Sequence, residues 1–333
     1  MPAWLFILVE DPWSALYNHA WVPALVLTIG TATALRRRSH GVPMAVWSPR
    51  ERWVLWVLTA GALFAFIAQQ LGRDLAAVRF VNPDWTTNFI WWKYVTVLAA
   101  VLLPLLAVAV ILRSARRDVE ERVAPTTARD WMTFSNRSAL AGAGFLLAAF
   151  AVLMIWTGVT STQASDGAYR LLVAPGSFTG AGFLEEGRDF FGWSYSIPVV
   201  AAVLVVAAAS WAVLRENALR PFRRPSTLER ERQARRKISS TVLTLSGGAV
   251  LLTLAIVLRD TGGAGMPHQG MMLEDGTHVA VGASYEALGR LFIALAAILR
   301  TAGLTLLLAI PLLSWLPSFA SHRDVAAQAG ALR

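Results

Sequence analysis

The chain has 333 residues, of which 56% are hydrophobic and only 15% are charged, and its mean hydropathy is +0.51. It contains no cysteine, which excludes disulfides, thiolate metal sites and cysteine nucleophiles. Its net charge of +9 would be compatible with nucleic-acid binding, but the distribution of the charges along the chain indicates a different origin.

The apolar residues fall in blocks of about 20, the length that a helix needs to cross a hydrocarbon core about 30 Å thick. We therefore expect an all-α fold, a polytopic integral membrane bundle with a single transmembrane domain over residues 1–333. Residues 1–9 are apolar but too short to span, and we interpret them as an interfacial or re-entrant segment. Seven spans are expected, at about 17–35, 52–71, 91–112, 138–158, 195–214, 238–258 and 297–317.

Basic residues predict the orientation, because cytoplasmic segments of membrane proteins are enriched in Lys and Arg. With the N-terminus outside and the C-terminus in the cytoplasm, 22 of the 30 basic residues lie in inner segments. This asymmetry accounts for the net charge without nucleic acid, and it favours contact between the inner loops and anionic lipid. The basic cytoplasmic loops are then 36–51, 113–137 and 215–237, and the long outer loops are 159–194 and 259–296.

The tryptophans agree with this topology. They concentrate at the expected span ends, as in the aromatic belts of membrane proteins.

The choice between the two basic residues indicates the source. Only two of the 30 basic residues are lysines, Lys93 and Lys237, which indicates the coding bias of a GC-rich bacterium. We therefore expect the plasma (inner) membrane of such a bacterium as the location.

Three helical hairpins follow one plan, in which an inward span ends on arginine, a basic loop follows and a capping box opens the outward helix. The boxes are Ser48–Glu51, Thr127–Asp130 and Ser226–Glu229. They indicate either a loosely repeated hairpin, as found in transporters, or only the sequence features that helices starting on the inner side have in common. After the third box, residues 226–240 can continue unbroken into the sixth span, which predicts a cytoplasmic extension able to contact a partner.

The last apolar stretch, 284–317, is too long for one straight span, and Arg300 interrupts it. We expect an interfacial helix at about 285–299 followed by a short span. The alternative places Arg300 inside the membrane, at a cost of at least ~2.5 kcal/mol.

The segment 265–278, GMPHQGMMLEDGTH, holds three of the seven methionines and two of the five histidines. Thioether and imidazole groups are ligands that suit copper. Five glycines in and beside the segment leave the geometry unfixed, so a solvent-exposed loop is the alternative to a copper site. The candidate ligands are Met266, His268, Met271, Met272 and His278.

The first long outer loop places charges beside aromatic residues, and it is interpreted as a lid or a partner-docking segment. The alternative is an interfacial helix whose charges face water. Its candidate residues are Glu185, Glu186, Arg188 and Asp189. Polar groups at the outer span ends add Gln69, Gln70, Lys93 and Arg300.

The positions of histidine and lysine argue against two cofactors. All five histidines lie at or beyond span ends, so no intramembrane pair is available to hold a haem iron. Neither lysine lies in the seventh span, which argues against a retinal Schiff base.

Three classes of function remain open at this point. The first is a permease-like protein or the membrane subunit of a transport system, and it is weakened by the lack of carboxylates inside the spans. The second is an accessory or structural subunit of a larger membrane complex, with partners at the outer loops. The third is an outer-face enzyme acting on a lipid or isoprenoid, with Glu185, Glu186, Asp189, Asp84 and His268 as its candidate groups.

Overall fold

The computed structural model has eight helices and two small sheets in the part of the chain that it describes. It describes residues 12–38, 48–78, 91–115, 130–164, 166–173, 187–222, 228–266, 268–272, 278–281 and 285–315. The helices are α2 (Pro12–Asn18), α3 (Trp21–Arg38), α4 (Pro49–Val78), α5 (Trp92–Ala115), α6 (Arg137–Thr160), α7 (Trp193–Leu219), α8 (Leu228–Ala264) and α9 (Glu286–Trp315).

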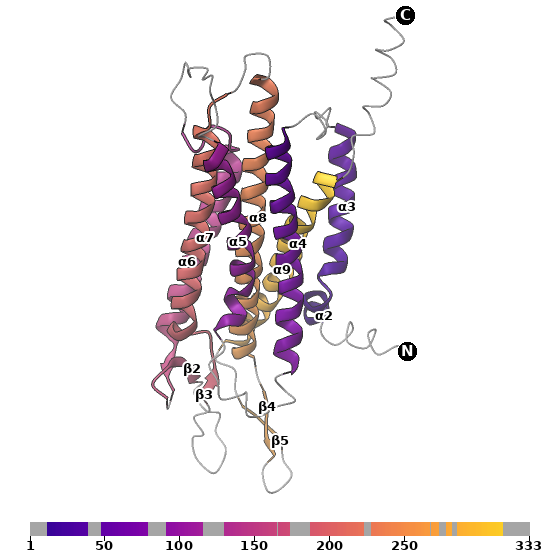
Figure 1. Cartoon of the computed structure of the whole chain (residues 1–333). Coiled ribbons are helices and arrows are strands. Elements are labelled where there is room, and N and C mark those ends of the chain that lie inside the picture. The colour runs from indigo at the N-terminus through magenta and orange to yellow at the C-terminus, as the bar shows by residue number, and fades with distance from the viewer. Residues whose placement is uncertain are drawn as a thin grey trace, which may run out of the picture.

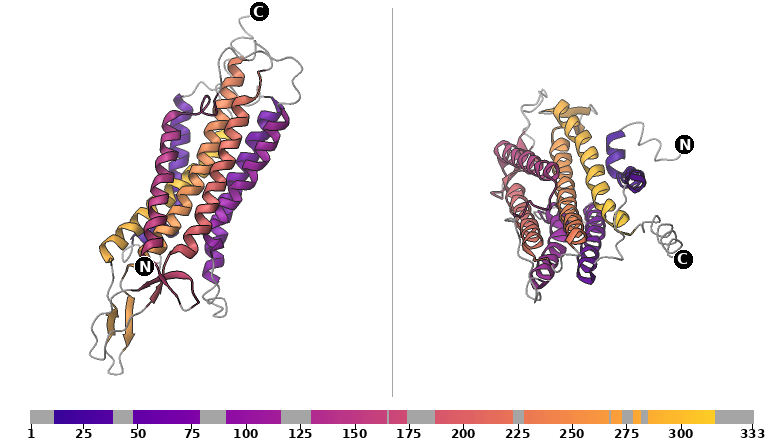
Figure 2. Two further views of the ribbon diagram at one scale, coloured as in Figure 1. Left: turned by 90° about the vertical axis from the view of Figure 1, so that its left-hand side faces the viewer. Right: turned by 90° about the horizontal axis from the view of Figure 1, so that it is seen from above.

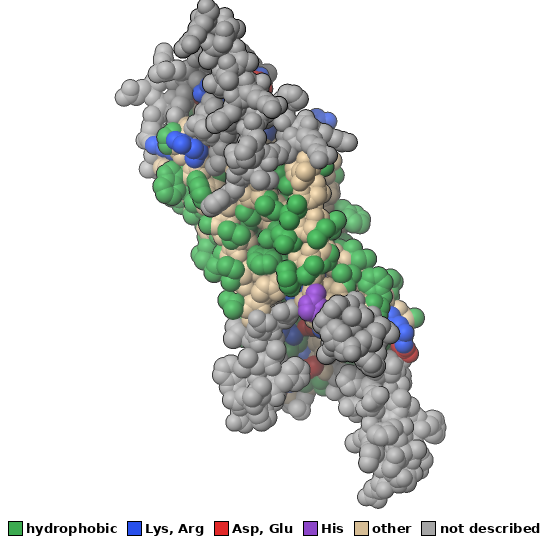
Figure 3. Space-filling view, turned by 90° about the vertical axis from the view of Figure 1, so that its right-hand side faces the viewer, with side chains coloured by type: hydrophobic (Ala, Val, Ile, Leu, Met, Phe, Trp, Pro, Cys, Tyr) green, Lys and Arg blue, Asp and Glu red, His purple; other side chains and the backbone are tan. Residues whose placement is uncertain are grey.

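Six of these helices, α4 to α9, are long and apolar enough to cross a membrane. Each forms because a helix satisfies all of its backbone hydrogen bonds internally, which is what a segment in hydrocarbon requires. Figure 3 shows the matching surface, a broad apolar belt with charged side chains toward its two ends. By the length and composition of its helices, the chain is a multi-pass membrane protein.

The helices run up and down, so that the two sheets lie together at one end of the bundle (Figure 1). We call this the sheet end, and the opposite end, where α4, α6 and α8 begin, the basic end. The described residues of the segments that the sequence assigned to the outer side lie at the sheet end. The side of the membrane that each end faces stays a prediction.

The first predicted span, 17–35, is interrupted. The short helix α2 ends at Asn18, a turn follows, and α3 begins at Trp21. The apolar part of α3, Trp21–Ala34, is shorter than the six long helices. Arginines at positions 36 to 38 end this apolar stretch early, and the break lets α2 pack across α9 at the sheet end.

The predicted shape of the last span, an interfacial helix followed by a short span, is wrong. Instead of an interfacial helix at 285–299 and a short span, α9 is one continuous helix from Glu286 to Trp315. It does not break at Arg300, because this side chain is buried inside the protein and not exposed to lipid. Helix α8 continues to Ala264 and α9 starts at Glu286, so the segment between these two helices is shorter than the predicted outer loop 259–296.

The capping boxes have three different outcomes. In the first, the Ser48 amide donates to Glu51 Oε2 at 3.1 Å and the Glu51 amide to Ser48 Oγ at 3.3 Å, as predicted. The second is wrong, because α6 begins at Arg137 and its cap is Asn136, whose Oδ1 accepts from the Ser138 amide. Residues 226 and 227 of the third lie outside the described residues, and α8 does run unbroken for 37 residues.

Helix α8 is the centre of the bundle and packs against α4, α5, α6, α7 and α9 (Figure 2). Its closest neighbour is α9, and small residues allow this approach. A Cβ atom on Gly262 would lie 2.7 Å from the Gly289 carbonyl oxygen, and one on Gly303 would lie 3.0 Å from that of Gly248. These close contacts therefore fix the position of α8 and α9 relative to each other along their axes.

The segment between α6 and α7 forms a three-stranded antiparallel sheet in the order β1 (Thr162–Gln163), β2 (Tyr169–Val173) and β3 (Gly187–Asp189). The described residues of this loop form short strands and turns, and the alternative of an interfacial helix is not seen among them. Arg170 ties the sheet together, since it donates to Asp166 Oδ2 at 3.1 Å and to Asp189 Oδ1 at 2.8 Å. The Ala168 amide and this guanidinium hold the pKa of Asp166 below its ordinary value.

The Met/His segment also has regular structure, as a hairpin of β4 (His268–Met272) and β5 (His278–Val281). Its register pairs Met272 with His278 and His268 with Val281, with an irregularity between them. The backbone of this hairpin therefore brings Met272 directly opposite His278.

Exposed tryptophans mark both ends of the apolar belt, as predicted. The sheet end carries Trp13, Trp21, Trp91 and Trp92, and the basic end carries Trp53, Trp56 and Trp211. Trp156 is different, because its ring packs against Phe190, Tyr285 and Phe292 inside the bundle.

Candidate functional site

Ionisable and aromatic side chains from four helices meet inside the sheet end of the bundle. We call this group the polar cluster, and it consists of Tyr17, Asn18, Lys93, Tyr94, Arg259, Asp260 and Arg300. Lys93 and Tyr94 lie in the first turn of α5, and Arg259 and Asp260 lie near the end of α8. The antiparallel course of α5 and α8 brings these two helix ends to the same level.

Asp260 is the carboxylate of the cluster. Its Oδ2 atom accepts from Lys93 Nζ at 2.8 Å and from the Tyr94 hydroxyl at 2.6 Å. Hydrogen bonds to an ionised acceptor are stronger than neutral ones, so Asp260 joins α5 firmly to α8. Both members of the Lys93–Asp260 ion pair are partly exposed, which leaves this part of the cluster in reach of solvent.

Two arginines lie against the ring of Tyr17. The guanidinium carbon is 4.2 Å from the ring centroid for Arg259 and 4.3 Å for Arg300. Arg259 also donates from Nη1 to Asn18 Oδ1 at 3.3 Å. A buried aromatic face attracts a guanidinium more strongly than an exposed one does, so α2 is held to α8 and α9 through this ring.

Arg300 lies deeper in the bundle than the other members. It stands fourteen residues after Glu286, about 21 Å from the start of α9. Only 2% of the residue is exposed. Helical side chains lean toward the helix N-terminus, which for α9 is the sheet end, so this long side chain extends toward Tyr17. An arginine near the middle of a span is a costly feature, and such residues usually serve a function.

Two glutamines of α4 lie at the level of the cluster. Gly61 of α4 packs against Pro104 of α5, where a Cβ atom would come 2.7 Å from the proline Cβ. From that contact, Gln70 and Tyr94 are nine and ten residues nearer the sheet end, which is about 14 Å along each helix. Both polar atoms of the Gln70 amide are buried and have no hydrogen-bond partner in the described part of the chain.

An aromatic wall connects the cluster to the three-stranded sheet. The ring of Tyr94 meets Phe191 edge-on at 4.8 Å and Tyr195 at 5.4 Å. Phe191 follows β3, and the amide of its neighbour Phe190 donates to the Arg170 carbonyl. The position of the sheet and the position of Tyr94 therefore depend on each other.

Helix α9 begins beside a further buried contact, where the Tyr285 hydroxyl donates to the Thr261 carbonyl at 2.9 Å. Burial raises the pKa of this tyrosine to about 12. The neutral hydroxyl thus links the start of α9 to the end of α8 over the ordinary pH range.

The structure brings some of the predicted site residues together and separates others. Lys93 and Arg300 belong to the polar cluster, and Gln69 and Gln70 lie at its level. Asp189 is instead bonded to Arg170 in the sheet. Glu185, Glu186 and Asp84 lie outside the described residues, as does the side chain of Arg188, which stands opposite Leu172 in β3.

The copper hypothesis stays a prediction. The backbone of His268, Met271, Met272 and His278 lies in the hairpin, and Met266 precedes it. Where the structure describes side chains, no group of three or more His, Asp or Glu residues is placed to hold a metal ion.

Sequence reasoning missed Tyr17, Tyr94, Arg259 and Asp260, which form most of the polar cluster. One signal was present, since Arg259 and Asp260 end the sixth span at the level where Lys93 opens the third. Opposite charges at one predicted level of a membrane are candidates for pairing. No comparable signal marked Tyr17, because its contact depends on the break between α2 and α3.

Three comparisons with known proteins, by family model, by curated sequence and by solved structure, give no match. Any functional conclusion must therefore come from the geometry of the polar cluster and its surroundings.

Proposed function

We propose that this chain is a permease-like membrane protein, or the membrane subunit of a transport system, that binds a solute with an anionic group at the polar cluster. In this proposal α3 is a seventh span beside α4 to α9, and the sheet end faces the outside. The location is the plasma membrane of a bacterium. The observation that carries the proposal is the burial of Arg300 in the middle of α9.

Several properties of the cluster support an anionic solute. Arginine offers a planar set of donors that matches carboxylate and phosphate groups. Lys93, Arg259 and Arg300 bring three cations into the cluster, and Asp260 bonds to Lys93. The buried amide of Gln70 adds donor and acceptor atoms that a bound solute would satisfy, since buried polar atoms usually have partners.

The proposal is tested by ligand-induced stabilisation of the purified protein in mild detergent. The probes are phosphate, sulfate, nitrate and a set of small carboxylates, each as the sodium salt against sodium chloride at equal ionic strength. A ligand that binds only the folded state and is present at 100 times its Kd adds about 2.7 kcal/mol of stability. We expect one class of anion to raise the melting temperature by about 5 °C in a saturable way.

The matched variants are Arg300→Gln and Arg290→Gln, both on α9. Arg290 is exposed and pairs with Glu286 at 2.6 Å, so its substitution leaves the cluster intact. We expect the anion effect to vanish in the first variant and to remain in the second. Equal responses in both variants, or no response to any anion in the wild type, would contradict the proposal. Uptake of the active anion into proteoliposomes then separates a permease from a protein that only binds.

A subunit of a larger membrane complex is the second candidate, and helix α6 favours it. This helix is apolar along its length, and only Phe150, Met154, Thr157 and Gly158 of it are buried. Its exposed face carries small residues, with nothing within 4 Å of a Cβ atom on Gly142 or Gly144. Small residues on a span allow another helix to pack closely. A native mass spectrum in mild detergent distinguishes the candidates, because partner subunits would add their masses to that of the chain.

A further inference from the structure

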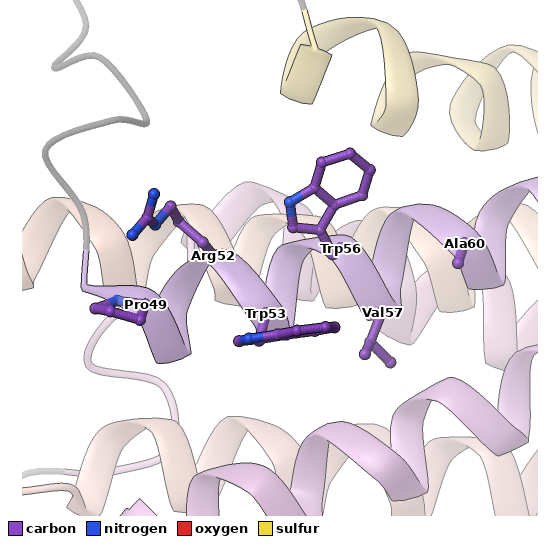
Figure 4. Close-up of a pocket in the computed structure, with 6 residues that line it drawn as sticks. All are labelled: Pro49, Arg52, Trp53, Trp56, Val57 and Ala60. Atoms are coloured by element: carbon purple, nitrogen blue, oxygen red, sulfur yellow. The ribbon is translucent and has the colours of Figure 1, made fainter.

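A groove on the outside of α4, far from the polar cluster, has the features of a lipid site. It is an open cavity of about 600 Å³ at the basic end, and we call it the α4 groove (Figure 4). Its lining residues recur every three or four positions, which puts them on one face of the helix. They are Pro49, Arg52, Trp53, Trp56, Val57 and Ala60.

The groove runs from the helix end into the apolar belt. It begins at Pro49, the first residue of α4, and reaches Ala60 about 16 Å further along the axis. That distance corresponds to roughly half of a hydrocarbon core about 30 Å thick. Trp53 and Trp56 are 67% and 47% exposed, as expected for indoles at the level of lipid headgroups. The groove therefore covers the depth of one lipid leaflet.

The lining side chains change from charged to apolar along the axis of α4. Among the lining residues that the structure describes, Arg52, at the end near Pro49, is the only ionisable one, and Val57 and Ala60 line the deeper part. Figure 4 shows Arg52 and Trp56 pointing toward the side of α9, and Trp53 and Val57 pointing away from it. A cation at the headgroup level above an apolar channel matches a phosphate group above an acyl chain.

The adjacent carboxylate does not weaken this positive charge at the surface. Glu51 is buried on the opposite side of α4, where it caps the helix and accepts from Arg220 at 2.8 Å. Its charge is thereby balanced inside the protein, while the guanidinium of Arg52 is exposed.

We propose that the α4 groove binds one anionic phospholipid, with its phosphate at Arg52 and an acyl chain along Trp53, Val57 and Ala60. An anionic headgroup is favoured over a zwitterionic one because the one charge among the described lining residues, that of Arg52, is positive. This inference is independent of the proposed solute at the sheet end.

Native mass spectrometry with phosphatidylglycerol and with phosphatidylcholine tests the assignment. One basic residue at an anionic lipid surface contributes about fivefold to affinity, so Arg52→Gln should weaken the first phosphatidylglycerol bound about fivefold. Phosphatidylcholine should lose less affinity than phosphatidylglycerol, because its choline cation offsets the charge of its phosphate. The matched control is Arg137→Gln, which removes an exposed arginine from the first position of α6 at the same end of the bundle. We expect this control to bind both lipids as the wild type does.

A second variant tests the apolar part of the groove. Trp53→Ala removes an exposed ring, so the protein should still fold, and it should weaken both lipids to a similar extent. Equal binding of phosphatidylglycerol by the wild type and Arg52→Gln would overturn the assignment. An equal loss in Arg137→Gln would do so as well, because it would show a general attraction of anionic lipid to the basic end.

Discussion

Glu51 and Arg220 stand 169 positions apart in the sequence and form a buried ion pair at the basic end, with Nη2 of the arginine 2.8 Å from Oε1 of the glutamate. Side-chain exposure is 8% for the arginine and 5% for the glutamate. The other carboxylate oxygen, Oε2, accepts from the Ser48 amide and caps α4. A single carboxylate thus fixes the start of α4 and ties it to the residue that ends α7.

Glu51→Gln separates these two roles. Glutamine can also complete a capping box, so the start of α4 should survive. The charge of Arg220 is then buried without its partner, which usually costs 3 to 5 kcal/mol, or on the order of 5 °C or more in melting temperature. Thermal unfolding in detergent, followed by circular dichroism, measures the loss.

The control for this prediction is Glu229→Gln. Glu229 pairs with Arg232 at 3.5 Å on the exposed surface of α8, where an ion pair contributes about 0.5 kcal/mol or less. A melting temperature that falls equally in the two variants would refute a special role for the buried pair.

Tyr17 provides a test of the arginine contacts in the polar cluster. Tyr17→Phe keeps the ring that faces Arg259 and Arg300, whereas Tyr17→Leu removes it. A desolvated cation–π contact contributes about 2 kcal/mol, so we expect the leucine variant to be less stable than the phenylalanine variant by about that amount. Comparing the two in one melting experiment isolates the ring. If they melt together, Tyr17 acts through its apolar volume alone.

Gly61 tests the α4–α5 packing that sets Gln70 at the level of the polar cluster. A Cβ atom at this position would lie 2.7 Å from the Cβ atom of Pro104, so Gly61→Ala must push α4 and α5 apart. Overpacking of this kind costs about 1 to 3 kcal/mol.

The matched control is Gly142→Ala, where a Cβ atom meets nothing within 4 Å. There the better helix propensity of alanine should add up to about 1 kcal/mol. The two substitutions should therefore shift the melting temperature in opposite directions. A loss at both positions would mean that the effect comes from the helices themselves and not from the α4–α5 contact.

Tyr285 predicts a dependence of stability on alkaline pH. Its pKa is about 12 in the folded protein because the ring is buried, and 10.0 is the ordinary value. The group therefore contributes its full stability below pH 10, and this contribution is lost as pH rises from about 10 to 12. We expect wild type and Tyr285→Phe, melted across this range, to converge in stability as the pH rises. A constant difference between them would refute the assignment.

The β4–β5 hairpin focuses the test of copper binding on two residues. Met272 and His278 are direct partners across the strands, so a copper site in this hairpin should depend on both. Met272→Leu and His278→Ala should each abolish binding of Cu(I) in a native mass spectrum. A wild-type chain that carries no copper after incubation with Cu(I) would reduce the hairpin to a connector.

Hydropathy was sufficient to predict the six long helices, because a span needs a long apolar block and few other folds use one. The long α8 was also predictable, since the charged residues before Ile238 keep a strong helical composition. The predicted break in the last span failed for a physical reason. A sequence scale treats Arg300 as exposed to lipid, whereas packing against Tyr17 from a distant helix places it inside the protein.

The sequence did not predict the strands in the loops. The strands β1 to β5 are only two to five residues long, too short to give a reliable alternation of polar and apolar residues. Arg170 organises the first sheet through contacts to Asp166 and Asp189, and the second of these spans 19 positions. Such pairings depend on register, which the composition of a loop does not reveal.

The unbroken course of α8 connects the two ends of the molecule mechanically. Near the basic end, its buried Arg235 donates to the Pro221 carbonyl, and near the sheet end Asp260 holds Lys93. The 25 residue steps from Arg235 to Asp260 give a rod about 37 Å long, stiffened along its axis by continuous hydrogen bonds. A displacement of the first turns of α8 along the helix axis would therefore move Asp260 by nearly the same distance. A contact made at one face of the membrane could in this way change the polar groups near the other face.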